Sequence, residues 1–288
     1  APFAAAHFNR YSDFGLIANL LTVPVMGAVI MPAGAVAALL APIGLAGPPL
    51  WVMELGARWI LFVAHWISGL EGSVTAIAAP GPAALPLFTL GALWLILWRG
   101  RVQWLGVAPV LVAAVLWFTS ERPALLISGD GKLLGLAGPE GRALSAATGG
   151  GFAAENWLEN DGDLAGQNLA AARPGFSGPK GEKRLMLADL RVVALSGKGA
   201  ADRLTDACRN SDLVILAAEA EGVPEGCPLI DAGVLEETGP LAVWQRGDTL
   251  RIERTKSKRR LWSAPYKTVS LPRLETRTST VPPVAIAP

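Results

Sequence analysis

The distribution of charged side chains divides the 288-residue chain into an apolar first part and a polar second part. Only seven Asp, Glu, Lys or Arg residues precede Ser120, and 42 follow it. A soluble domain normally carries about 25% charged residues, so the first part does not have the composition of one. The pattern predicts a membrane domain over residues 1–121, a soluble domain over residues 122–262 and a disordered tail over residues 263–288.

Residues 16–53 form an uncharged run of 38 residues, and a membrane-spanning helix needs about 20. Five prolines interrupt it: Pro24, Pro32, Pro42, Pro48 and Pro49. Two short or re-entrant helices fit this pattern, and so does one kinked span followed by an interfacial segment. Helix breaks at membrane depth need protein or water around the freed backbone groups, and they are common in transporters. Proline is, however, also frequent in ordinary membrane helices.

The segment Leu50–Leu70 has the periodicity of an amphipathic helix. Its apolar stripe consists of Trp51, Leu55, Trp59, Phe62 and Trp66. A second face carries Glu54 and Arg58, spaced as an (i, i+4) pair, with His65 near the same side. This polar face could line a pathway through the membrane. The alternative, which we favour, is a helix lying in the membrane interface with its charges in water.

A helical hairpin is expected next, with one helix over residues 85–98 and a second over residues 102–120. Arg99 and Arg101 lie in the turn between them. Positive charge marks the cytoplasmic side of membrane proteins, so this turn is expected in the cytoplasm. The chain after Ser120 would then be outside, which in a bacterium is the periplasm.

After Pro123 the pattern changes to short runs joined by turns, which predicts an α/β or α+β domain. The expected strands lie within residues 124–128, 132–136, 184–195 (as one strand or two), 212–217, 227–231, 241–245 and 249–253. The expected helices lie within residues 155–158, 164–172, 198–209 and 233–237.

The soluble half contains no histidine, because His7 and His65 both belong to the first part. Zinc sites normally use His or Cys ligands, and a Ser–His–Asp triad also requires His. No phosphate loop or complete dinucleotide fingerprint is present either. We therefore expect no enzymatic activity, no metal and no cofactor.

Cys208 and Cys227 are the only cysteines of the chain. A periplasmic location would allow a disulfide between them, enclosing the strand expected at residues 212–217 and an acidic loop at residues 219–225. The alternative is two unrelated buried thiols.

A basic cluster closes the soluble half: Arg251, Arg254, Lys256, Lys258, Arg259 and Arg260. Such a cluster can bind nucleic acid through the phosphates. A solvated basic tail is the plainer interpretation, because no aromatic side chain for base stacking occurs before Trp262.

The first part resembles the membrane region of ComEC-family competence proteins, which are associated with the entry of single-stranded DNA during natural transformation. The resemblance lies in residues 7–12 (HFNRYS), in residues 19–24 (NLLTVP) and in the Pro/Gly-broken run that follows. It implies motif roles for His7, Asn9, Asn19 and Pro24, with Asn19 and the backbone at Pro24 placed at a helix break. The first helices and small β domain of a typical member are absent, so a fragment of a longer protein is expected.

Many members of that family continue into a metallo-β-lactamase-like domain. Residues 152–163 resemble the segment that precedes its His-rich metal motif, and residues 212–222 resemble a later strand that leads to a His pair. Neither segment is followed by histidine here, so the resemblance implies a degenerate α/β domain that lacks the metal chemistry.

The resemblance implies an inner-membrane, multi-pass channel component that moves single-stranded DNA into the cytoplasm. Its implied partners are the lipid bilayer, single-stranded DNA and other competence-machinery proteins, with oligomerisation left open. The alternative is a membrane-anchored periplasmic binding or scaffold domain without transport. A third interpretation, an active nuclease, is disfavoured by the missing metal ligands.

Overall fold

A computed structural model describes residues 2–246, 249–255, 271 and 274–275. The chain forms two compact units, Ala1–Ile77 and Ala78–Pro288. Helical apolar segments come first and a mixed α/β region follows, as the sequence predicts. Within the described residues, three helical runs are long and apolar enough to cross a membrane: Gly15–Ile43, Gly47–Ser68 and Arg101–Phe118.

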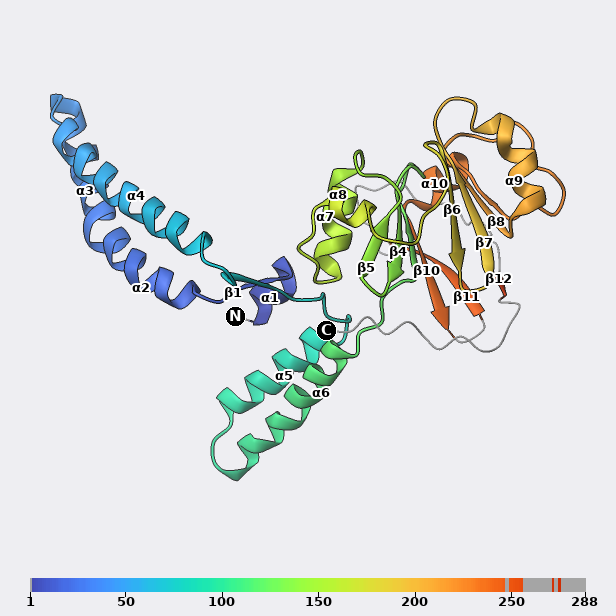
Figure 1. The fold of residues 1–288 in the computed structure, drawn as a ribbon. Helices are drawn as coiled ribbons and strands as arrows, with labels where there is room; N and C mark the ends of the chain where they lie inside the picture. The colour runs from blue at the N-terminus through green and yellow to red at the C-terminus, as the bar shows by residue number, and fades with distance from the viewer. Residues whose placement is uncertain (1, 247–248, 256–270, 272–273, 276–288) are drawn as a thin grey trace. The chain divides into compact units, whose positions relative to one another are not determined.

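The first unit is a pair of long antiparallel helical runs with a small strand pair at its base (Figure 1). The first run comprises α2 (Gly15–Val25), a π-helical segment (Met26–Ile30), α3 (Met31–Leu40) and a 3₁₀ turn (Ala41–Ile43). Gly44, at φ 78°, ends it, and α4 (Gly47–Ser68) returns alongside. The helix α1 (Pro2–Phe8) precedes β1 (Arg10–Ser12), which pairs antiparallel with β2 (Val74–Ala76).

The expected break around Pro24 is wrong, because the helix continues through it. The distortion lies after it, where the Met31 N–H bonds to the Met26 carbonyl, five residues back. This wide turn immediately precedes Pro32. A proline ring clashes with the carbonyl four residues before it, here that of Ala28, so a local π turn gives the ring room without ending the helix.

The second unit begins with a helical hairpin of α5 (Ala84–Leu97) and α6 (Val107–Phe118), joined through a 3₁₀ segment (Arg101–Gly106). Two glycines let the backbones approach closely. A Cβ on Gly91 would lie 2.7 Å from the Gly106 carbonyl oxygen, and a Cβ on Gly106 would lie 2.7 Å from that of Gly91. Trp94 stacks on Trp98 near the turn, with ring centroids 4.1 Å apart.

Two sheets pack face to face in the rest of the second unit. The larger sheet has the order β12-β11-β10-β3-β4-β5, and all of its pairings are antiparallel. Its strands are β3 (Leu125–Ile127), β4 (Leu134–Gly138), β5 (Gly141–Leu144), β10 (Leu241–Arg246), β11 (Thr249–Arg254) and β12 (Leu274–Glu275). Of the tail for which disorder was expected, the structure describes only Leu271 and the two residues of β12.

The smaller sheet has the order β6-β7-β8-β9. The hairpin of β6 (Glu182–Leu187) and β7 (Leu190–Leu195) is antiparallel, while β8 (Leu213–Leu216) and β9 (Leu229–Ile230) continue in parallel. The sequence left open whether residues 184–195 form one strand or two. The structure has two, joined at Ala188, whose φ is 55°.

The main core lies between the sheets, and helices cover their outer faces (Figure 1). Inward residues of the two sheets include Leu125, Ile127, Val243, Val192 and Ile215. The helices α7 (Gly151–Asn160) and α8 (Gln167–Ala171) pack on the larger sheet, and α9 (Leu204–Asn210) packs on β7 and β8. The helix α10 (Ala232–Thr238) leads into β10, with Asp231 accepting a hydrogen bond from the Val234 N–H.

Candidate functional site

The four motif residues of the first unit do not converge. His7 is exposed at the end of α1, and Asn9 is buried in the left-handed conformation, at φ 53°, where its carbonyl accepts a hydrogen bond from the Ile77 N–H. Asn19 and Pro24 are both exposed on α2, five residues apart. That spacing places them on different faces of a helix, roughly 140° apart. Asn9 therefore positions the strand pair, while the other three motif residues are exposed.

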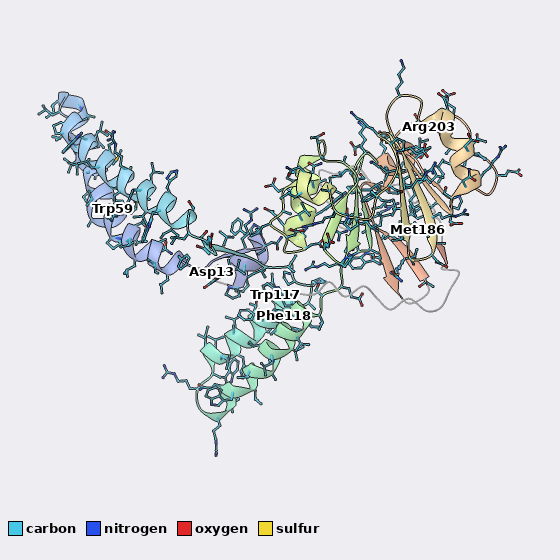
Figure 2. All side chains as sticks on the ribbon, in the orientation of Figure 1. Asp13, Trp59, Trp117, Phe118, Met186 and Arg203 are labelled. Carbon is cyan, nitrogen blue, oxygen red and sulfur yellow. A yellow bond between two sulfur atoms is a disulfide. The ribbon has the colours of Figure 1, made fainter. Side chains whose placement is uncertain are left out.

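One contact between the long helices was not predicted. The Trp59 indole on α4 donates a hydrogen bond to the Leu21 carbonyl on α2, at 3.1 Å (Trp59 is labelled in Figure 2). This carbonyl lies in the turn before Pro24. The sequence placed Trp59 only in an apolar stripe, because a 3.6-residue period describes faces and not individual donors.

The polar residues of α4 lie opposite its buried face. Gly56, Val63 and Ile67 are buried against α2, the π-helical segment and α3. Glu54, Arg58 and His65 are exposed, and helical geometry places them about 180° from that buried row. Arg58 Nη2 lies 2.7 Å from Glu54 Oε1, and His65 Nδ1 lies 2.7 Å from the Leu61 carbonyl oxygen. We call this set the α4 polar face.

The α4 polar face belongs to a helix long enough to cross a membrane. Ionisable side chains within a bilayer normally face a water-filled cavity or another protein. The first unit itself offers the α4 polar face no cover among the described residues, since all three side chains are exposed.

A buried ion-pair network holds the junction between the helical hairpin and the sheets of the second unit. Arg142, fully buried on β5, donates to Asp161 at 2.5 Å and to the carbonyls of Gly135 and Pro123. Arg122 donates to the Ala79 carbonyl at 2.6 Å. Burial lowers the pKa of the Arg122 guanidinium, an effect that the Asp161 carboxylate opposes and Arg142 reinforces.

Both ends of the hairpin are tied into this junction. The Ala79 N–H donates to the Asn160 carbonyl, and the Trp117 indole donates to the Ala78 carbonyl. Nearby, Arg173 bonds Asp163. Burial acts to raise the pKa of Asp163, but hydrogen bonds from Arg173 and the Ala165 N–H, together with the Arg173 charge, outweigh it and leave the pKa below its usual value.

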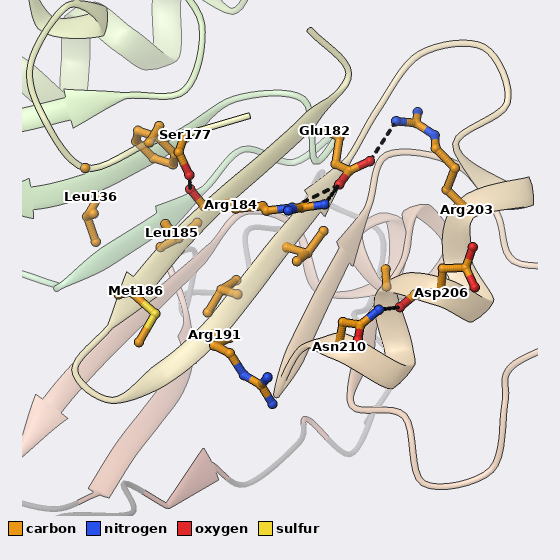
Figure 3. A pocket seen from close by; sticks show the side chains of 15 residues that line it. Leu136, Ser177, Glu182, Arg184, Leu185, Met186, Arg191, Arg203, Asp206 and Asn210 are labelled. Carbon is orange, nitrogen blue, oxygen red and sulfur yellow. Dashed lines mark hydrogen bonds and ion pairs between the residues drawn. The ribbon is translucent and has the colours of Figure 1, made fainter. Parts of the chain in front are cut away.

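A groove of about 820 Å³ lies on the outer face of the β6–β7 hairpin beside α9 (Figure 3). Three arginines line it: Arg184, Arg191 and Arg203. Glu182 accepts from Arg184 at 2.6 Å and from Arg203 at 3.5 Å, so one carboxylate is shared by two guanidinium groups. Arg191 bonds Asp212 through Nε, at 3.3 Å. The sequence did not predict this groove, because its walls come from β6, β7 and α9, whose packing no local pattern encodes.

A disulfide joins Cys208 on α9 to Cys227 just before β9, with the Cα atoms 5.4 Å apart. Of the basic cluster, the structure describes Arg251 and Arg254 on β11, where Arg251 lies 3.0 Å from Glu253. Lys256, Lys258, Arg259 and Arg260 lie outside the described residues. Among the residues that are described, no group of three His, Cys, Asp or Glu side chains could hold a metal ion.

Residues 1–102 match the model of a protein family described as Competence protein. The match covers roughly the first third of the chain and includes the whole first unit and α5. No curated protein and no solved structure matches the chain. The first third of the chain is therefore similar to competence proteins, and the three apolar helical runs have the length and composition of membrane spans.

Proposed function

We propose that the chain is a ComEC-like inner-membrane component that conducts single-stranded DNA into the cytoplasm, and that its soluble part is accessory. The observation that carries this is the coincidence of two features in one unit. The family match covers the first unit, and in that unit a membrane-length helix presents the α4 polar face away from its neighbours. Ionisable side chains within a bilayer need water or other protein around them, and a water-filled path for a polar polymer would supply that.

The same proposal gives α4 its position relative to the path. The buried row of Gly56, Val63 and Ile67 would hold α4 against α2 and α3, while Glu54, Arg58 and His65 would face the DNA. The Trp59 bond to the Leu21 carbonyl would fix the rotation of α4 about its own axis. Arg58 would meet the phosphates directly, and its pairing with Glu54 would keep its charge stabilised between passages.

We propose that the soluble part is a degenerate metallo-β-lactamase-like domain in the periplasm, without enzymatic activity. Its two facing sheets with outer helices are compatible with the resemblance, and the soluble half has no histidine. The Cys208–Cys227 disulfide supports an oxidising compartment, since disulfides are rare in the cytosol.

Cysteine accessibility tests the conduit. Glu54→Cys, Arg58→Cys and His65→Cys would be treated in cells with a membrane-impermeant maleimide, with and without incoming DNA. We expect all three to react, and DNA to protect them. Matched variants on the apolar stripe of the same helix, Leu55→Cys and Phe62→Cys, should stay unreactive.

The outcome separates the two candidate functions. If the α4 polar face reacts no faster than Leu55→Cys and Phe62→Cys, or if it reacts but DNA does not protect it, as in a helix lying in the membrane interface, the conduit proposal is wrong. A membrane-anchored periplasmic binding or scaffold protein would then be the better interpretation. DNA entry that persists in cells lacking residues 7–120 would reject the conduit independently.

A further inference from the structure

The outer face of the β6–β7 hairpin carries two exposed arginines in a defined register. Met186 is directly opposite Arg191, and Arg184 is directly opposite Val193, so Arg184 and Arg191 are diagonal neighbours on the same face. Diagonal neighbours across an antiparallel pair are about 7–8 Å apart. That separation is comparable to the spacing of successive phosphates along an extended single strand of nucleic acid.

The donors of these two side chains are only partly used. Arg184 bonds Glu182 through Nε and Nη2, and Arg191 bonds Asp212 through Nε. In the part of the chain that the structure describes, Nη1 of Arg184 and both terminal nitrogens of Arg191 have no hydrogen-bond partner. The guanidinium fork matches the oxygens of a phosphate, so each arginine can take one phosphate without giving up its carboxylate.

The groove also has an apolar side. Met186, which is 55% exposed and is labelled in Figures 2 and 3, lies next to Arg184 along β6 and opposite Arg191 on β7, and the half-buried Phe176 also lines the groove. A thioether and an aromatic ring are suitable surfaces for the flat face of a base. The neighbouring α9 covers β7 and β8 but not β6, so the groove is open along the hairpin.

Positive and negative groups are unevenly distributed within the groove. The shared Glu182 leaves one guanidinium charge in excess at the Arg184–Arg203 end. Asp206 on α9 is exposed at the opposite wall, as Figure 3 shows. An anionic polymer is therefore attracted to the strands and to Arg203 at the start of α9, and is repelled from Asp206 further along that helix.

We propose that this groove binds single-stranded DNA, with Arg184 and Arg191 each holding one phosphate and with bases against Met186 and Phe176. The inference rests on the proposed role in DNA uptake, but it concerns a different surface from the α4 polar face. The groove would hold the incoming strand on the soluble part before the strand enters the membrane.

The test is fluorescence anisotropy of a short labelled thymidine oligonucleotide titrated with the purified full chain in detergent, at several salt concentrations. Replacing both arginines, Arg184→Ala with Arg191→Ala, should weaken binding by about tenfold for each lost charge-assisted contact. The slope of log K against log salt should become shallower by about 1.4, because each phosphate contact to a single strand contributes about 0.7.

Two further variants make the result specific. Arg209→Ala removes the same charge from an exposed position on α9 that does not line the groove, and it should leave both affinity and slope unchanged. Asp206→Asn should tighten binding, because it removes the repelling carboxylate. A general charge effect would move Arg209→Ala and the groove variants alike.

Wild-type affinity and slope in the double arginine variant would overturn the proposal, and so would absence of oligonucleotide binding by the wild-type chain. If the variant instead loses binding to phosphatidylglycerol vesicles while oligonucleotide binding is unchanged, the groove takes a lipid headgroup and the proposal is wrong. Cysteine accessibility of the α4 polar face is measured separately, so failure of the groove and failure of the conduit are distinguishable.

Discussion

At the scale of single residues, Arg142 is a buried charge that needs several hydrogen-bond partners. Its guanidinium is fully buried and is satisfied by Asp161 and by the carbonyls of Gly135 and Pro123. A buried charge is tolerated only when such partners are complete. The arginine therefore makes β5, the end of α7 and the chain after α6 depend on one another.

Replacement of Arg142 by Met should destabilise β3, β4 and β5 by about 3–5 kcal/mol, because Asp161 keeps a buried charge with only the more distant Arg122 nearby. Hydrogen exchange of the full chain, read as the free energy of opening these strands, measures the effect. The double variant Arg142→Met with Asp161→Asn should recover part of the loss. Unchanged exchange in the single variant would show that the network does not hold these strands.

Asp163 makes the stability of the same region depend on pH. Its pKa is lowered in the folded chain, so it binds protons more weakly when folded than when unfolded. Its contribution is therefore fully present above the unfolded pKa of about 3.9 and is lost as pH falls through the lower folded value. Asp163→Asn should reduce protection of α8 from hydrogen exchange at pH 7, and this difference from wild type should shrink below pH ~4. A difference of constant size across that range would contradict the assignment.

At the scale of elements, the hairpin of α5 and α6 depends on two glycines. Gly91→Ala would place a methyl group 2.7 Å from the Gly106 carbonyl oxygen, a backbone atom that cannot move aside alone. Overpacking of this kind costs about 1–3 kcal/mol. We expect a lower melting temperature of the chain in detergent and faster tryptic cleavage at Arg99 and Arg101.

Gly27→Ala is the matched control, since a Cβ there meets no atom within 4 Å. It should leave the melting temperature and the cleavage rate close to those of the wild type. Equal effects of Gly91→Ala and Gly27→Ala would mean that the close approach of α5 and α6 does not determine the stability of the hairpin.

The elements that sequence analysis predicted well are those with strong periodicity or clear turn residues. The hairpin of β3 and β4, the strand β8 and the helices α4 and α5 all follow from apolar patterns bounded by Gly or Pro. The turn between β6 and β7 did not show, because Ala188 adopts a left-handed conformation that is usual for Gly or Asn. The start of α7 at Gly151 was also missed, since a run of glycines favours a loop.

The candidate surfaces were less predictable than the elements, for physical reasons. The α4 polar face could be read from spacing alone, because one helix carries all three residues. The π turn could not be predicted from the sequence. Pro24 and Pro32 look equally disruptive there, and only the backbone hydrogen bonds show that the helix widens before Pro32. The arginine groove unites β6, β7 and α9 through tertiary packing that no local pattern encodes.

At the scale of the whole molecule, the disulfide joins α9 to the segment that leads into β9. Cys208→Ser with Cys227→Ser should lower the stability of this region by about 3 kcal/mol in the chain-entropy model. Hydrogen exchange of β8 and β9 in the full chain would report it, with reduced wild-type protein behaving like the variant. If the wild-type protein from cells shows two free thiols, the proposed periplasmic location loses its chemical support.

The same disulfide spans the exposed, glutamate-rich loop between β8 and β9, with Glu219, Glu221 and Glu225 inside the covalent ring. A glutamate-specific protease that cuts this loop once therefore releases no fragment. The nicked chain migrates as one species until a reductant divides it into two fragments. Cleavage of the backbone here is thus not detected by electrophoresis without reductant, and the surface loop can be cut while the sheet on either side stays joined.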